Sequence, residues 1–346
     1  SSNKDYLKEL EYAYNNILNS YVEKVDEKEL TNAAIKGMYN YLGDPYTSYL
    51  DKDSTDNLMD RLKGEYKGIG VEITTNESGT VVMTVFENSP AEEAGIMVGD
   101  IITKVKGVDV NGKTTSEVSN MIKSTNGNVE IEVNRGGITK TLTLKVSTVR
   151  IKSVIKNKYD KTGYLRIETF SNTTYKQFKE NLETLEKDGI ENLIVDVRNN
   201  GGGFLNSAVE IAELFVEKGK PIYGLQTKDK KEMYKDTTKE KRDYKVMVLI
   251  NGGSASASEV LAAALKESYG ATLLGTKSYG KGTVQDTSEL ESGGMIKYTT
   301  AYWLTPKGVT INEKGLTPDI EVTGSFKDGM TLENDVELQT AINNLK

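Results

Sequence analysis

The spacing of apolar residues changes twice along the chain. Between residues 4 and 23, apolar side chains recur at intervals of three and four, which predicts an amphipathic helix that packs against another helix. From Tyr66, short alternating runs are separated by glycine turns, which is typical of strands. After about Val149, strand-like runs alternate with helical patterns. This alternation of strand-like and helical patterns predicts βαβ units and a sheet covered by helices on both faces.

These changes predict the fold class α/β plus mixed, in which an α/β core is combined with a helical region and a β-rich domain. We expect an N-terminal helical region at 1–65, a β-rich domain at 66–148, an α/β core at 149–330 and a C-terminal helix at 331–346. The N-terminal helices either pack within the chain or form a dimer contact. The last helix either closes the core or pairs with the N-terminal helices in a homodimer.

The most informative stretch runs from residue 246 to residue 285. An apolar strand, Val246 to Ile250, breaks at two glycines and is followed by a helix that begins near Ser256 and ends at Gly270. Ser256 and Glu259 have the S-x-x-E spacing of a capping box, so Ser256 lies at the positive end of that helix. A serine there can cap the helix, or it can attack a substrate.

Composition restricts how Ser256 could be activated. The chain contains no histidine and no cysteine, which excludes the Ser-His-Asp triad, the Cys-His dyad and the common zinc sites. A nucleophilic Ser256 therefore needs a lysine or a carboxylate as its base. Lowering a lysine pKa from about 10.4 to near 7 costs roughly 4 to 5 kcal/mol, and burial among apolar side chains is the usual means. Lys281, between two strand-like runs and flanked by glycines, is the best-placed candidate.

Two other classes of function fit the residues less well. The 44 basic and 51 acidic residues give a formal charge of −7 without a long basic run, which argues against a nucleic-acid partner. Residues 275–281 satisfy most of a phosphate-binding Walker A pattern, but Gly282 stands where the magnesium-binding hydroxyl is needed. A strand rather than a helix is also predicted after Lys281, which argues against a nucleotide hydrolase.

Four motifs resemble those of the C-terminal processing (tail-specific) peptidases, a family of serine proteases with a Ser-Lys mechanism. They lie at residues 254–259, 280–285, 196–203 and 308–319. The resemblance covers most of the chain. Carried over residue by residue, the resemblance implies that Ser256 is the nucleophile, Lys281 the general base and Gln285 the side chain that orients the lysine.

The glycines at 201–203 follow a predicted buried strand. Without side chains they let the backbone approach a ligand, as an oxyanion hole requires. We assign the first oxyanion donor to the N–H of Gly202 or Gly203 and the second to the N–H of Ala257. Many family members have proline where this chain has Gly201, so the donor is left open between the two glycines. Taken alone, three glycines are also compatible with a flexible turn.

The β-rich region at 66–148 looks like a PDZ domain. Its loop Gly68, Ile69, Gly70 and Val71 can form a nest of N–H groups for a terminal carboxylate, and the strand that follows can accept a peptide by β-augmentation. A plain strand start is the alternative for this loop. Arg135, at the tip of the last predicted hairpin, is either a single exposed charge or a regulatory contact that docks onto the protease body.

These features predict a serine endopeptidase that captures the C-terminal tail of a protein and cleaves near it. Neither a cofactor nor a metal is expected, and the partners are proteins or peptides with exposed C-terminal tails. The family works outside the cytoplasm, so the resemblance implies a secreted protein or one tethered to a membrane through a segment outside this sequence. The alternative is a noncatalytic PDZ scaffold that only binds peptides.

Overall fold

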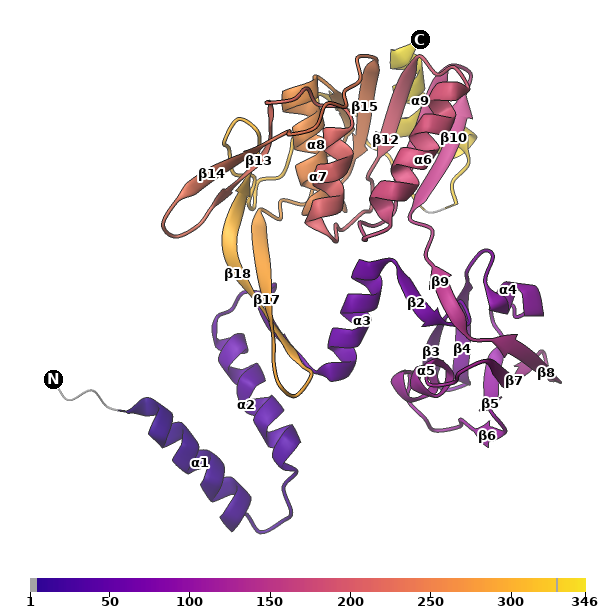
Figure 1. Cartoon of the computed structure of the whole chain (residues 1–346), viewed down its shortest axis with the longest axis vertical. Helices are drawn as coiled ribbons and strands as arrows, with labels where there is room; N and C mark the ends of the chain where they lie inside the picture. The colour runs from indigo at the N-terminus through magenta and orange to yellow at the C-terminus, as the bar shows by residue number, and fades with distance from the viewer. Residues whose placement is uncertain (1–4, 328) are drawn as a thin grey trace. The chain divides into compact units, whose positions relative to one another are not determined.

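The chain forms two compact units, which we describe separately (Figure 1). The computed structural model describes residues 5–327 and 329–346. One unit comprises the residues up to Asp56 together with Gln285–Thr300, and the other comprises Asn57–Val284 with Ala301–Lys346. Residues 285–300, which the sequence assigns to the α/β core, therefore share a unit with the N-terminal helices.

The first unit begins with two helices, α1 (Tyr6–Ser20) and α2 (Glu27–Tyr41). An aspartate caps each helix by accepting a backbone N–H: Asp5 caps α1 and Asp26 caps α2. Neither helix contains a buried residue. The short strand β1 (Ser48–Leu50) pairs antiparallel with the beginning of β18 (Met295–Leu304), and α3 (Lys52–Lys63) follows it along the chain.

The β-rich domain contains a sheet in the order β3-β4-β5-β7-β8, with β6 paired to β5. Its strands are β3 (Val71–Asn76), β4 (Gly79–Val85), β5 (Ile101–Val105), β6 (Val108–Asp109), β7 (Asn128–Arg135) and β8 (Ile138–Lys145). The helices are α4 (Pro90–Ala94) and α5 (Thr115–Lys123), which are capped by Ser89 and Thr114. A separate pair, β2 (Glu65–Gly68) and β9 (Ser147–Arg150), joins the two ends of the domain. Alternating apolar residues of these strands form one continuous core.

The α/β core is built on a six-stranded sheet in the order β10-β11-β12-β15-β16-β19. Its strands are β10 (Val154–Tyr159), β11 (Thr162–Ile167), β12 (Asn192–Asp196), β15 (Lys245–Ile250), β16 (Thr272–Gly275) and β19 (Ile320–Glu321). All neighbouring pairs are parallel except β10 with β11. The predicted fold class is confirmed.

Helices cover both faces of this sheet (Figure 1). One face packs against α6 (Thr174–Lys187), α7 (Leu205–Glu213) and α8 (Ala257–Ala264). The other face packs against α9 (Val336–Leu345). Its Leu338, Ile342 and Leu345 are buried against the strand side chains that point to this face, which are alternate residues of each strand. Of the two roles expected for the last helix, closing the core is therefore the one found in this chain. It begins five residues later than 331 because Asp335 caps it after a 3₁₀ turn, Leu332–Asn334.

A second, smaller sheet has the order β1-β18-β13-β14, with β17 (Thr283–Glu289) also paired to β18. The sequence did not predict the hairpin of β13 (Pro221–Gln226) and β14 (Lys231–Lys235). Among the residues that the structure describes, no helix combines the length and hydrophobicity needed to cross a bilayer.

A buried ionic cluster anchors the start of α9 to the end of β12. The guanidinium of Arg198, which is 0 % exposed, donates to Asp196 at 2.8 Å and to Asp335 at 2.7 Å. The ring of Phe326 lies 3.9 Å from that guanidinium. This cluster fixes the backbone immediately before the glycine turn at 201–203.

Candidate active site

Ser256 lies in a strained turn at the carboxyl end of the central strand β15. Its φ is +56° and its ψ is −115°, a backbone conformation that non-glycine residues rarely adopt and that costs of order 1 to 3 kcal/mol. The turn is held by Ser254, whose hydroxyl donates to the carbonyl of Val197 at 2.7 Å. Such strain at a serine between a strand and a helix is the geometry of a nucleophile elbow. In open α/β sheets, ligands bind outside the carboxyl ends of the strands, where this turn is found.

The predicted capping box forms at the start of α8. The Ser256 N–H donates to Glu259 Oε1 at 3.0 Å, and the Glu259 N–H donates to the Ser256 carbonyl oxygen at 2.9 Å. The sequence pattern therefore marks the helix start correctly.

The glycine turn packs directly against this elbow. A Cβ on Gly202 would lie 3.0 Å from the Ser256 Cβ and 3.2 Å from the Ala257 nitrogen, and φ at Gly202 is +107°. A Cβ on Gly203 would lie 2.1 Å from the Phe170 carbonyl oxygen. Only glycine fits at either position, so this segment is a tightly packed turn.

Asn200 fastens the glycine turn to the elbow, and sequence reasoning gave it no role. Its carbonyl oxygen accepts the Ala255 N–H at 3.1 Å and the Ser258 hydroxyl at 2.8 Å. Its side-chain oxygen accepts the Gly202 N–H at 2.9 Å. Within the described part of the chain, the neighbouring Gly203 N–H has no acceptor. The two candidate oxyanion donors thus differ: the Gly202 N–H already donates to Asn200, whereas among the described residues the Gly203 N–H does not donate to an acceptor.

The backbone of Lys281 is fixed on both sides. Its N–H donates to Glu259 Oε1 at 3.0 Å, and its carbonyl oxygen accepts the indole N–H of Trp303 at 2.8 Å. The residue is half-buried. Because β17 follows as a strand and not a helix, the Walker A alternative lacks the structural context it needs.

The motif at 308–319 closes over the glycines that flank Lys281. A Cβ on Gly280 would lie 3.0 Å from the Gly315 nitrogen, and one on Gly282 would lie 2.6 Å from the backbone of Asn312. The Gly282 N–H donates to Asn312 Oδ1 at 3.1 Å. Both flanking glycines are therefore required for close backbone packing.

Gln285 lies in β17, and it is the first residue of that strand that belongs to the first unit. Its amide Nε2 donates to Thr299 Oγ1 at 3.0 Å, and Thr299 Oγ1 donates to Asp44 Oδ2 at 2.5 Å. Asp44 comes from the segment 41–50, so that segment sets the orientation of the amide.

Three family models match the chain. Residues 161–322 match peptidase family S41, residues 68–146 match the PDZ domain, and residues 1–54 match the activating protease CtpB N-terminal domain. A solved structure described as the photosystem II D1 C-terminal processing protease is 30 % identical to the chain, with a TM-score of 0.54. That match covers 92 % of this chain and 87 % of the other.

The chain belongs to peptidase family S41. The resemblance to C-terminal processing peptidases is thereby confirmed, as is the PDZ domain.

Relatives of this S41 chain come from staphylococci. It is 37 % identical over 320 residues to a probable CtpA-like serine protease of Staphylococcus haemolyticus, and 38 % identical over 320 residues to one of Staphylococcus aureus strain N315. Each match covers 91 % of this chain and 64 % of the relative. The S41 chain thus spans somewhat less than two thirds of the length of these curated relatives.

In the PDZ domain, the loop from Gly68 to Val71 connects β2 to β3. Ile69 is buried, and its carbonyl oxygen accepts the Ala91 N–H at 2.8 Å. Gly70 has φ of +92°, and a Cβ there would lie 2.1 Å from the Ser89 Cβ. The strand that follows the loop, β3, lies at one end of the sheet order and pairs only with β4 among the described strands.

Arg135 forms an ion pair inside the PDZ domain. Its Nε donates to Asp100 Oδ1 at 2.8 Å, and its Nη2 donates to Asp100 Oδ2 at 2.8 Å and to the Gly95 carbonyl oxygen at 2.7 Å. The Asp100 side chain is 1 % exposed. The Arg135 guanidinium beside Asp100 holds the pKa of that carboxyl below its ordinary value.

Replacing Arg135 with Ala is therefore expected to destabilise the PDZ domain in a pH-dependent way. A lowered carboxyl pKa contributes stability above the unfolded-state value of about 3.9, and that contribution is lost as the pH falls through the folded-state value. The Arg135→Ala variant should lose more thermal stability near pH 7 than near pH 3. Lys140→Ala, which removes a more distant charge near Asp100, is the control and should change the unfolding temperature less. An equal loss at both pH values would contradict this assignment.

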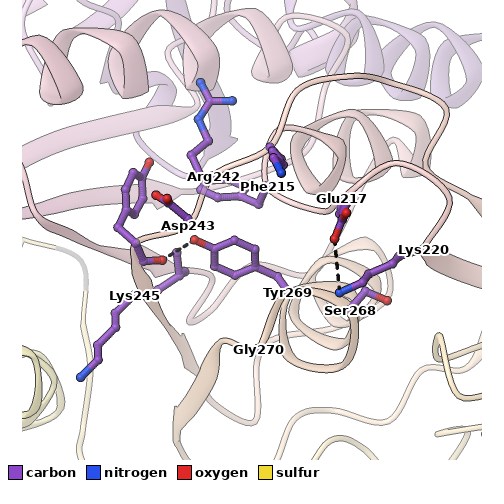
Figure 2. A pocket seen from close by; sticks show the side chains of 12 residues that line it. Phe215, Glu217, Lys220, Arg242, Asp243, Lys245, Ser268, Tyr269 and Gly270 are labelled. Atoms are coloured by element: carbon purple, nitrogen blue, oxygen red, sulfur yellow. Dashed lines mark hydrogen bonds and ion pairs between the residues drawn. The ribbon is translucent and has the colours of Figure 1, made fainter.

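A separate cleft lies at the opposite end of the S41 core sheet (Figure 2). Its lining includes Lys245, the first residue of β15, together with Arg242 and Lys220. Tyr269 donates to the Tyr244 carbonyl oxygen at its wall. None of the candidate catalytic residues lines this cleft, so it is distinct from the site around Ser256. In the part of the chain that the structure describes, no group of three or more acidic side chains is arranged to hold a metal ion.

Proposed function

We propose that the chain is the catalytic portion of a serine endopeptidase that cuts proteins near their C-terminal tails. Ser256 is the nucleophile, Lys281 the general base and Gln285 the side chain that orients the lysine. The observation that carries the proposal is the strained backbone of Ser256, packed against a turn that only glycine can form. Strain of this kind persists where the surrounding structure over-determines it, and it gathers at active sites.

In the proposed reaction, the neutral Lys281 amine takes the Ser256 hydroxyl proton as the oxygen attacks the peptide carbonyl carbon. The tetrahedral intermediate then collapses, and the lysine gives the proton to the departing amine. In the second half, Lys281 takes a proton from water, which attacks the acyl-enzyme ester. The proton returns to Ser256 as the new carboxyl group leaves.

The oxyanion is proposed to form between the N–H groups of Gly203 and Ala257. Gly203 is favoured over Gly202 because the Gly202 N–H already donates to Asn200 at 2.9 Å. The Ala257 N–H is the first of its helix, where N–H groups lack intrahelical acceptors and the helix dipole favours negative charge. Each such donor is typically worth about 3 to 4 kcal/mol in the transition state.

Tail capture is assigned to the PDZ domain. The proposal rests on the position of β3 at the edge of its sheet and on the loop Gly68–Val71 that precedes it. A peptide would add to β3 as a further strand, and its terminal carboxylate would meet the loop. Arg135 is proposed as a regulatory contact, which requires it to exchange Asp100 for a group on the protease body. Unchanged basal and peptide-stimulated cleavage in Arg135→Ala would remove that role.

The proposal is tested by incubating the protein with a peptide that ends in small or apolar residues. We expect cleavage of the free-acid peptide and weaker binding of the same peptide with an amidated C-terminus, because the amide removes the terminal charge. Ser256→Ala should bind the free acid without cutting it. Binding of the free acid by the unaltered protein without cleavage would favour the scaffold alternative.

Location outside the cytoplasm and a homodimer belong to the same proposal. The location rests on the resemblance to CtpA-like proteases. The dimer rests on α1, where Leu7 is 74 % and Leu10 is 46 % exposed. The apolar face of α9 is already covered by the core sheet, so the N-terminal helices are the better contact. A monomer mass in solution at micromolar concentration would argue against the dimer.

A further inference from the structure

Glu259, three residues after Ser256, is a buried acid of the S41 core with hydrogen bonds to both of its oxygens. It is 0 % exposed, and its carboxylate accepts four hydrogen bonds. Oε1 accepts the N–H of Ser256 and the N–H of Lys281, each at 3.0 Å. Oε2 accepts the Ser278 hydroxyl at 2.6 Å and the Gly280 N–H at 2.9 Å.

A helix cap accounts for only one of these bonds. The Ser256 N–H belongs to the capping box, whereas the other three donors come from residues 278–281, outside the helix. A carboxylate at the third position of a helix is favoured by the helix dipole, but that does not require it to bind a second segment. The additional bonds tie the segment of the candidate base to the segment of the candidate nucleophile.

We propose that Glu259 is a positioning residue that sets the separation of the Ser256 and Lys281 backbones. The inference rests on the proposed function, because it assigns Glu259 a role through those two residues. Since both nitrogens bond the same oxygen, they lie no farther apart than twice 3.0 Å. The four-carbon stem of a lysine then has a fixed starting point relative to the serine.

Ser278 extends this connection to a third segment. Its hydroxyl donates to Glu259 and accepts the Leu316 N–H at 2.7 Å, and its backbone N–H donates to the Leu316 carbonyl oxygen at 3.1 Å. Glu259 therefore holds the helix start, the lysine segment and the motif at 308–319 around one carboxylate. Four donors match an ionised carboxylate, which only accepts hydrogen bonds. Burial raises the pKa of Glu259, and the hydrogen bonds from these four donors act in the opposite direction.

The test compares Glu259→Gln with Ser278→Ala. A glutamine keeps the shape but has only one acceptor oxygen, so in either orientation its NH₂ group faces a backbone N–H of the lysine segment, that of Gly280 or that of Lys281, and displaces the segment. Ser278→Ala removes one donor from Oε2 and leaves both Oε1 bonds in place. The measurements are kcat and KM for a peptide, and the rate of Ser256 labelling by a fluorophosphonate, each corrected for the folded fraction.

For Glu259→Gln we expect kcat and the labelling rate to fall together by about 10- to 100-fold, with KM changed less than about 3-fold. The reason is that misplacement by about 1 Å can cost that much. Ser278→Ala should keep kcat within about 3-fold, although both variants lose hydrogen bonds in the same cluster. A wild-type labelling rate per folded molecule in Glu259→Gln would overturn the inference.

If Glu259→Gln does not fold, amide hydrogen exchange of the wild-type protein tests the inference instead. The inference predicts that the amides of Ser256 and Lys281 are both protected, and exchange at open-loop rates contradicts it. Failure of the proposed function is a different result. In that case Ser256→Ala keeps activity, or the wild-type protein does not cleave peptides, whatever the effect at Glu259.

Discussion

Replacing Ser256 with Ala is expected to abolish peptide cleavage, with kcat/KM lowered by about 10⁴-fold or more. The variant should still fold, because the backbone N–H and carbonyl oxygen of residue 256 hydrogen-bond to Glu259 and do not depend on the side chain. Peptide hydrolysis followed by mass spectrometry measures the loss, and thermal unfolding reports the fold. Cleavage at the wild-type rate by Ser256→Ala would show that another group is the nucleophile.

Ser256→Gly provides the matched control for this variant. Alanine keeps the unfavourable φ of +56°, whereas glycine adopts positive φ readily. Both variants should be inactive, but Ser256→Gly should be the more stable, by an amount up to the 1 to 3 kcal/mol of such strain. Equal or lower stability of Ser256→Gly would mean that the elbow stores no strain at this residue.

Replacing Lys281 with Ala is expected to lower kcat by about 10²- to 10⁴-fold, the usual contribution of a general base. Lys281→Arg should be just as impaired, because arginine keeps the length and charge but cannot release a proton at working pH. Lys277→Ala is the control, since Lys277 is exposed and lies four residues away in the same segment. The prediction is checked by steady-state kinetics with a peptide substrate.

The three lysine variants distinguish a role of Lys281 in proton transfer from a role of its positive charge. If Lys281→Arg retained activity, a positive charge alone would suffice at this position and proton transfer would need another base. If Lys277→Ala lost as much activity as Lys281→Ala, the effect would lie in the segment and not in the individual side chain. Either result would contradict the assignment of Lys281.

Much of the fold could be predicted because local patterns and tertiary contacts agree. Ser89 followed by Pro90, and Thr114 followed three residues later by Glu117, are local signals of a helix start, and α4 and α5 begin there. The strand from 246 to 250 was recognised because it is apolar on both faces, as a central parallel strand must be. The C-terminal helix is shorter than expected because Asp335 was not recognised as its cap.

Other features depend on contacts between distant residues, which no local pattern reports. The grouping of residues 285–300 with the N-terminal unit depends on the pairing of β18 with β1, a strand of three residues. Asn200 looks like part of a polar turn until its bonds to Gly202, Ala255 and Ser258 are seen. Glu259 fits a capping box so well that its three further donors could not be anticipated.

The candidate site also has features that the sequence predicts and features that only the structure reveals. The residue types were predicted from composition and from the family resemblance: a serine at a helix start, a lysine between glycines and a glycine turn. What the sequence left open was the choice of oxyanion donor, because Gly202 and Gly203 are equivalent in a pattern. They differ only through the side chain of Asn200, which accepts the N–H of the first.

The most direct test of the account is the pH dependence of Ser256 labelling by a fluorophosphonate. We predict that the labelling rate rises with pH along a single titration and reaches its plateau well below about 10.4, the ordinary lysine value. In Lys281→Ala this titration should disappear and the rate should stay low. A labelling rate that rises only near the ordinary lysine value, or one that is unchanged in Lys281→Ala, would contradict the claim that a neutral Lys281 activates Ser256.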